Sequence, residues 1–122
     1  LVFKDPEAVT QNIRAVCTHL AGQDFSYKIA APVAALDGSF LQKDEEGNFW
    51  RVFPFLENTF APEGAPDADI ALEAARAYGA FARALRDFPA DTLAETIPGF
   101  HDTDQRWQVF LEILEKNPAG RV

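Results

Sequence analysis

Nucleophilic catalysis needs a serine, threonine or cysteine beside a base, and this chain offers one cysteine, Cys17, and two histidines, His19 and His101. Cys17 and His19 are two residues apart in a segment whose apolar residues have helical spacing, so we expect their side chains to point away from each other. We therefore predict no Cys/His pair and interpret Cys17 as a small apolar residue of a core. No catalytic residue is predicted within this chain.

Candidate metal ligands occur together in His101-Asp102-Thr103-Asp104. Asp102 and Thr103 lie where the next predicted helix needs an N-cap, so capping is our interpretation and metal binding the alternative. The acidic residues 44–48 lack the spacing and the distal glutamate of an EF-hand loop, and a solvated turn accounts for them. The sequence predicts no metal site.

Two other types of site lack a sequence signal. Neither phosphate-binding glycine pattern, G-x-G-x-x-G or G-x-x-x-x-G-K-[ST], occurs in the chain. Nineteen acidic residues produce many carboxylate pairs by chance, so a glycosidase pair cannot be identified among them. Taken alone, the chain contains no convincing catalytic group.

Three segments have the apolar spacing of helices and would position these residues. The first begins at Asp5, an N-cap residue, and ends near Gly22. The second covers residues 69–88 and carries many alanines, which permit close packing. The third has Asp102 or Thr103 as its cap.

Between the first two helices the pattern changes to that of strands. Short apolar or alternating runs, separated by turn residues, lie at 33–36, 39–42 and 48–55. They predict a three-stranded antiparallel meander, followed by a proline- and glycine-rich connector at 58–68. An N-terminal helix, three strands, a connector and two or three helices, in this order, indicate an α+β fold.

Composition limits the partners of this chain. Eleven basic against nineteen acidic residues give a net charge of −8, which repels the phosphates of nucleic acids and anionic lipids. No apolar run approaches the ~20 residues that span a bilayer, and a single cysteine allows no intrachain disulfide framework. We expect neither nucleic acid nor membrane as a partner, and a cytoplasmic location.

One strongly apolar segment, NFWRVFPFLENTF, is interrupted by Pro54. It is either a core strand that ends at a sheet edge or a strand that leads into a hinge. If the strand leads into a hinge, its free backbone N–H and carbonyl groups would face a flat heterocycle that lies between apolar side chains. The hinge residues would be Phe55, Leu56, Glu57 and Asn58.

Four motifs, NIRAVCTHL, WRVFPFLENT, ETIPGFHDTDQRWQVFLEIL and AGR, follow one another in the order and spacing of the aminoglycoside phosphotransferase-like kinases. The chain resembles this family over nearly its whole length and looks most like the N-acetylhexosamine 1-kinase branch. The resemblance implies part of a protein-kinase-like fold. Residues 1–57 would form a partial N-lobe, residues 58–68 a hinge and linker, and residues 69–122 the start of a helical C-lobe.

The resemblance also implies a function for the segment and for its parent protein. The backbone of Phe55, Leu56, Glu57 and Asn58 would hold the adenine of ATP. The parent would use ATP and Mg²⁺ to phosphorylate the anomeric hydroxyl of an N-acetylhexosamine, so a nucleotide and a small sugar would be its partners.

The same resemblance leads us to expect an inactive central fragment. The nucleotide-covering loop should precede Leu1, and the catalytic H-x-D-x-x-x-x-N loop and the metal-binding aspartate should follow Val122. His101 is followed by Asp102 and Thr103, does not match H-x-D, and is not assigned as a catalytic base. Such a fragment would expose apolar surface and self-associate through it.

Two alternatives stay open. The chain could instead be a non-catalytic α+β binding or interaction module, in which the aromatic segment is only core. Exposed aromatic or leucine side chains on the meander or the last helix would favour the kinase fragment over this module. A kinase of the same fold could also act on choline, homoserine or an aminoglycoside, because most of the acceptor pocket would lie beyond Val122.

Overall fold

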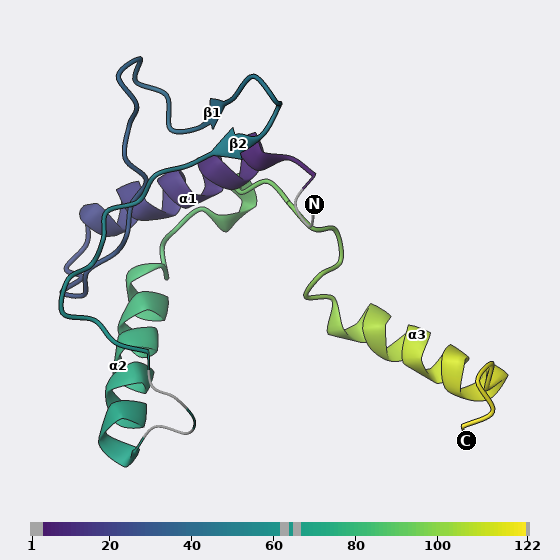
Figure 1. Cartoon of the computed structure of the whole chain (residues 1–122). Coiled ribbons are helices and arrows are strands. Elements are labelled where there is room, and N and C mark those ends of the chain that lie inside the picture. The colour runs from purple at the N-terminus through teal and green to yellow at the C-terminus, as the bar shows by residue number, and fades with distance from the viewer. Residues whose placement is uncertain (1–3, 62–63, 65–66, 122) are drawn as a thin grey trace. The chain divides into compact units, whose positions relative to one another are not determined.

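The computed structural model describes residues 4–61, 64 and 67–121. These residues divide into two compact units, a larger one at Asp5–Ala94 and a smaller one that contains Lys4 and the residues from Glu95 onward. The described part of the chain contains three α-helices and one two-stranded antiparallel sheet (Figure 1). The chain is therefore a small α+β protein, as the sequence predicts.

Helix α1, Pro6–Ala21, begins and ends at the predicted residues. The carboxylate of Asp5 accepts a hydrogen bond from the N–H of Ala8 at 2.9 Å, which satisfies one of the free donors of the first turn. The N–H of Gly22 donates to the carbonyl of His19 at 3.0 Å and closes the last turn. Both signals are local in sequence, which explains why this helix could be predicted.

The buried core of the larger unit is small. Among the described residues, Pro32 is buried, and so are Thr10 and Leu20 of α1, which are each 2 % exposed. The Thr10 hydroxyl donates to the carbonyl of Pro6 at 2.7 Å, so burial leaves it paired. Three buried residues make a very small core for a unit of this length.

Helix α2, Ala68–Ala84, starts at the N-cap Asp67, whose carboxylate accepts from the N–H of Ile70 at 2.9 Å. The prediction of a helix over 69–88 extends four residues too far. After Ala84 the chain forms tight turns, with bonds such as that from the N–H of Phe88 to the carbonyl of Leu85 at 3.0 Å. A short 3₁₀ helix, η1 at Ala90–Thr92, follows these turns and was not predicted.

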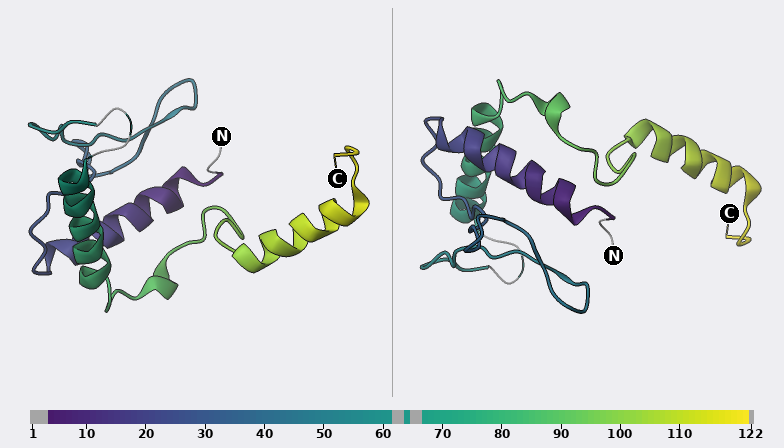
Figure 2. Two further views of the ribbon diagram at one scale, coloured as in Figure 1. Left: turned by 90° about the horizontal axis from the view of Figure 1, so that it is seen from below. Right: turned by 90° about the horizontal axis from the view of Figure 1, so that it is seen from above.

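Two contacts join α1 to the segment that ends the larger unit. The ring of His19 meets the ring of Phe88 edge-on, with centroids 5.2 Å apart, and His19 Nε2 lies 3.1 Å from the carbonyl oxygen of Ala84. Figure 2 gives two further views of α1 and of α2, which ends at Ala84. The side chain of Asn12 donates to the carbonyl of Ala94 at 2.7 Å and accepts from its N–H at 3.0 Å. These contacts fix the C-terminal part of this unit against α1.

The prediction of three strands is wrong, because the described residues contain only two. Strand β1, Gln42–Lys43, pairs antiparallel with β2, Phe49–Trp50, so that Gln42 is opposite Trp50 and Lys43 is opposite Phe49. Both strands lie within or beside the predicted second and third runs. The predicted first strand at 33–36 is not formed.

The lost strand has a physical cause in its turn. Val33 donates one ladder-like bond to the carbonyl of Val52 at 2.9 Å. Two residues later, the N–H of Ala35 bonds to the carbonyl of Ser39 at 2.7 Å, and Gly38 has a φ of 83°, which closes a tight turn. Because the N–H of Ala35 is bonded within the turn, it cannot extend the ladder that begins with Val33 and Val52.

Helix α3, Thr103–Lys116, belongs to the smaller unit and is capped as predicted. The carboxylate of Asp102 accepts from the N–H of Gln105 at 2.8 Å, and Asn117 ends the helix in the left-handed region with a φ of 38°. None of the residues of α3 is buried.

Two further sequence expectations concern the connector and the membrane. The predicted connector at 58–68 includes residues 62, 63, 65 and 66, which lie outside the described residues. In the part of the chain that the structure describes, no helix has the length and apolar character needed to cross a bilayer.

Candidate functional site

The predicted hinge residues follow β2, where the sheet ladder has ended. Val52 still accepts the bond from Val33, but the N–H groups of Phe55, Leu56, Glu57 and Asn58 donate no hydrogen bond to any described residue. The turn that follows is fixed by the Thr59 hydroxyl, which donates to the carbonyl of Leu56 at 2.9 Å. This leaves a short run of backbone donors open to a ligand.

Most of the large apolar side chains in and beside this segment are exposed. Phe55 is 87 % exposed, Leu56 is half-buried, and Phe53 and Phe60 are also exposed. Asn58 has a φ of 59°, a left-handed conformation that asparagine tolerates better than most residues. Free N–H and carbonyl groups beside aromatic faces can bind the edge and faces of a flat heterocycle.

A hollow next to this segment is too small to enclose a nucleotide. Its volume is about 160 Å³, whereas small-molecule sites usually measure ~300–1,000 Å³. It is lined by residues of the first predicted strand, of the sheet and of the segment after β2, including Val33, Phe40, Trp50 and Val52. Within the larger unit the candidate site is an open surface and not a closed pocket.

Arg51 lies between β2 and the candidate hinge, and the sequence analysis did not single it out. Its Nε and Nη1 atoms are shielded from solvent, and no described residue provides an acceptor for them. An unpaired, covered guanidinium is unfavourable, so an oxygen acceptor at this position would stabilise it. A single arginine just after a strand has no spacing signal from which this could have been predicted.

Cys17 and His19 are in different surroundings, as their spacing predicts. Cys17 lines a hollow with Leu20 and Phe25, and burial raises the pKa of its thiol. The thiol is therefore protonated at neutral pH and is a poor nucleophile. His19 instead contacts Phe88, so the two side chains do not form a catalytic pair.

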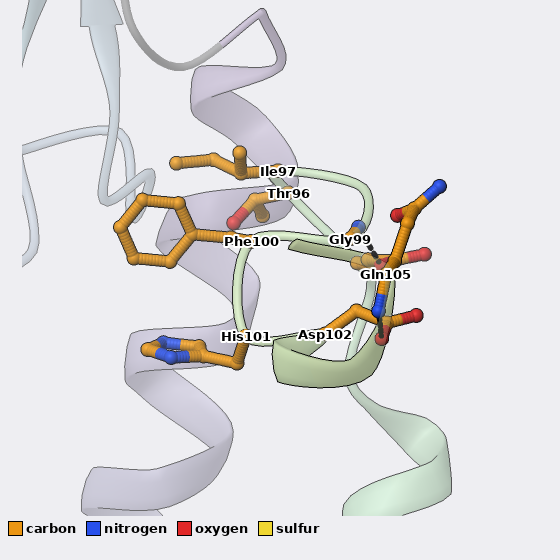
Figure 3. Close-up of a pocket in the computed structure, with 8 residues that line it drawn as sticks. Thr96, Ile97, Gly99, Phe100, His101, Asp102 and Gln105 are labelled. Atoms are coloured by element: carbon orange, nitrogen blue, oxygen red, sulfur yellow. Dashed lines mark hydrogen bonds between the residues drawn. The ribbon is translucent and has the colours of Figure 1, made fainter. Parts of the chain in front are cut away.

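A second hollow, of about 820 Å³, lies in the smaller unit at the start of α3. Figure 3 shows the side chains of Ile97, Phe100 and His101 on one side of its loop and those of Asp102 and Gln105 on the other. The ring of Phe100 has His101 edge-on at 4.7 Å between ring centroids. This hollow is open and is lined by exposed or half-exposed residues.

The carboxylates of this hollow are used by its own loop. Asp102 caps α3, and Glu95 accepts a hydrogen bond from the N–H of Gly99 at 2.8 Å. The capping interpretation of Asp102 is thus confirmed. Within residues 4–61, 64 and 67–121, no group of three or more histidine, cysteine or acidic side chains is arranged to hold a metal ion.

The chain matches no protein-family model, and no solved structure matches it significantly. The resemblance to aminoglycoside phosphotransferase-like kinases therefore depends on the sequence motifs and stays a prediction.

Proposed function

We propose that this chain is the hinge-bearing segment of an ATP-dependent small-molecule phosphotransferase and that the backbone of residues 55–58 holds adenine. The observation that carries this proposal is the run of unpaired N–H groups from Phe55 to Asn58, which lies beside exposed aromatic side chains. The motifs WRVFPFLENT and GFHDTDQR supply the kinase class by resemblance.

The chemistry assigned to this segment is positioning. Phosphoryl transfer requires that the nucleotide be held in line with the acceptor while charge on the transferred group is stabilised. Backbone donors and acceptors of residues 55–58 would orient the adenine edge, and Phe55 would cover one face of the ring. Mg²⁺ and the phosphates belong to parts of the parent protein outside this segment, and N-acetylhexosamine is the proposed acceptor.

Exposed apolar surface supports a segment that packs against further protein. Trp50 is 61 % exposed and Val52 is 63 % exposed, on the segment that leads to the candidate hinge. A self-contained binding module would bury such side chains in its own core, so this surface favours the kinase segment over the module.

The test is a one-residue insertion in the protein expressed from the complete reading frame. Inserting a glycine after Leu56 shifts the register of the backbone donors, so ATP binding measured by calorimetry should weaken by at least about 100-fold. A glycine inserted after Ala119, an exposed position near the end of the chain, is the matched control and should leave the affinity unchanged. Unchanged affinity after the Leu56 insertion would reject adenine binding at this hinge.

The acceptor is tested separately by phosphorylation assays with wild-type protein. Phosphate transfer to the anomeric hydroxyl of an N-acetylhexosamine is the expected result. Transfer only to choline, homoserine or an aminoglycoside would keep the kinase class and reject the proposed branch.

A further inference from the structure

Helix α3 carries a broad apolar face that the other described residues of the smaller unit do not bury. Its six large apolar residues are between 39 % and 54 % exposed. At about 100° per residue they occupy roughly half of the helix circumference. They are Trp107, Val109, Phe110, Leu111, Ile113 and Leu114.

This helix needs a partner for its own stability. It has 14 residues and buries none of them. An isolated helix of this length is only marginally stable in water, and most helical stability in proteins comes from packing of the apolar face. The stacked rings of Trp107 and Phe110, with centroids 5.4 Å apart, form an aromatic surface against which such a partner can pack.

The charges beside the apolar face indicate what the partner is. Trp107, Phe110 and Leu114 form the central stripe by their spacing of three and four residues. Asp104 flanks this stripe on one side and Arg106 on the other. Neither forms an ion pair with a described residue, although the guanidinium of Arg106 lies 5.2 Å from the ring centroid of Phe100.

A second copy of α3 in parallel orientation complements these charges. When two identical helices pair in parallel, opposite flanks meet, so Asp104 of each copy lies near Arg106 of the other. In an antiparallel pair the same flanks meet, which brings Asp104 near Glu115 and places two acidic side chains together. Opposite charges attract and like charges repel, so the parallel arrangement is favoured.

We infer that this chain dimerises through α3, with the two helices parallel and the stripe Trp107, Phe110 and Leu114 at the interface. The inference does not depend on the proposed kinase function. One four-turn helix offers less area than the ~800 Å² per partner of a standard interface, so the dimer is weak and concentration-dependent.

Single-cysteine variants of the 122-residue chain test both the contact and its direction. The background is Cys17→Ser, which removes the only native thiol. In a parallel pair Leu114 lies beside its own counterpart, so Leu114→Cys should form a disulfide-linked dimer under mild oxidation. Glu112→Cys, on the opposite face of the same helix, is the matched control and should stay monomeric. Circular dichroism checks that both variants keep their helix content.

Two results would overturn the inference. One is equal crosslinking, or none, of Leu114→Cys and Glu112→Cys. The other is crosslinking of Trp107→Cys only to Leu114→Cys in a mixture, because that pairing is antiparallel.

Sedimentation equilibrium tests the charge argument. Between about 10 μM and 1 mM, wild-type chain should shift from monomer to dimer, and Arg106→Glu should raise the dissociation constant about tenfold or more. Combining Arg106→Glu with Asp104→Arg restores opposite charges and should restore association. A wild-type chain that is monomeric throughout, or an Arg106→Glu variant that associates normally, contradicts the inference.

Discussion

Two exposed carboxylates fix the loops around the small sheet. Asp37 accepts hydrogen bonds from the N–H of Ser39 at 2.9 Å and from the side-chain amide of Gln42, and these donors lower its pKa to about 2. The indole N–H of Trp50 donates to Asp44 at 2.7 Å and lowers the pKa of that carboxyl. The charged forms of both residues hold their turns, because each donor bonds more strongly to a carboxylate than to a neutral acid.

The turn at Asp37 should therefore depend on pH in an acidic range. Its pKa in the folded chain lies below the ordinary value of 3.8, so the charged form stabilises the turn above that value, and this contribution is lost as the pH falls through about 2. An NMR titration of the Asp37 carboxyl should give a midpoint of about 2.

The variant Gln42→Ala removes one of the donors and should raise the midpoint toward the ordinary value. A wild-type midpoint near that of a free aspartate, ~3.9, would show that these hydrogen bonds do not hold the charge in solution.

In the larger unit, helix α1 is joined by hydrogen bonds to the segment that ends at Ala94. Asn12 makes a two-bond clasp with the backbone of Ala94, whereas the neighbouring Gln11 makes only a 3.4 Å contact with Glu7 on the same helix. A clasp between residues that are far apart in sequence contributes to the unfolding transition of the whole unit.

Replacing Asn12 tests this clasp. Asn12→Ala removes both bonds and should lower the free energy of unfolding by about 1–2 kcal/mol, measured by urea denaturation. Gln11→Ala is the matched control on the same helix and should change it by less than about 0.5 kcal/mol. Equal effects of the two substitutions would show that the clasp is not formed in solution.

The helices could be predicted from sequence, but most of the sheet could not. Asp5 and Asp102 cap their helices as predicted, because a cap needs only a side chain and an N–H three residues later. A strand needs a partner that is distant in sequence. Residues 33–36 form one hydrogen bond to Val52, and the chain then makes a turn, so no strand forms there. The end of α2 was predicted too late, because the apolar spacing continues past Ala84 into the turns.

Part of the candidate site could be predicted, because turn residues, like helix caps, are local signals in the sequence. Pro54 and the turn residues Glu57 and Asn58 predict that strand pairing stops near them. In the structure β2 ends earlier, at Trp50, and the last sheet-like bond is to Val52, while adenine binding at residues 55–58 stays a prediction. The covered guanidinium of Arg51 and the clasp of Asn12 were missed, since both depend on which residues surround them in three dimensions.

Each of the two units exposes much of its apolar surface and buries very little of it. In the larger unit Leu20 and Pro32 are buried, and large aromatic side chains lie exposed in both units. Stability of a domain comes mainly from apolar burial, so a chain with this little core gains stability from surfaces that cover it. The proposals for the kinase segment and for α3 pairing each supply such a surface.

A direct consequence concerns catalysis by the 122 residues alone. The sequence contains no H-x-D-x-x-x-x-N motif, so this chain by itself should release no ADP from ATP and Mg²⁺ above the uncatalysed rate, with or without N-acetylhexosamine. A coupled ADP assay on the purified chain checks this, with the protein from the complete reading frame as the positive control. Sugar-dependent ADP release by the isolated chain would contradict the proposal that catalysis needs residues outside these 122.

Adenine binding by residues 55–58 is tested by NMR. The protein expressed from the complete reading frame is labelled with ¹⁵N and titrated with adenosine. If residues 55–58 form the adenine-binding hinge, the amide signals of Phe55, Leu56, Glu57 and Asn58 should shift together and saturate with one dissociation constant. The amides of Asp44, Gly47 and Asn48, which are bonded within their own loop, should not move and serve as the internal control. If adenosine binds saturably but the amide signals of residues 55–58 do not shift, these residues do not form the adenine site.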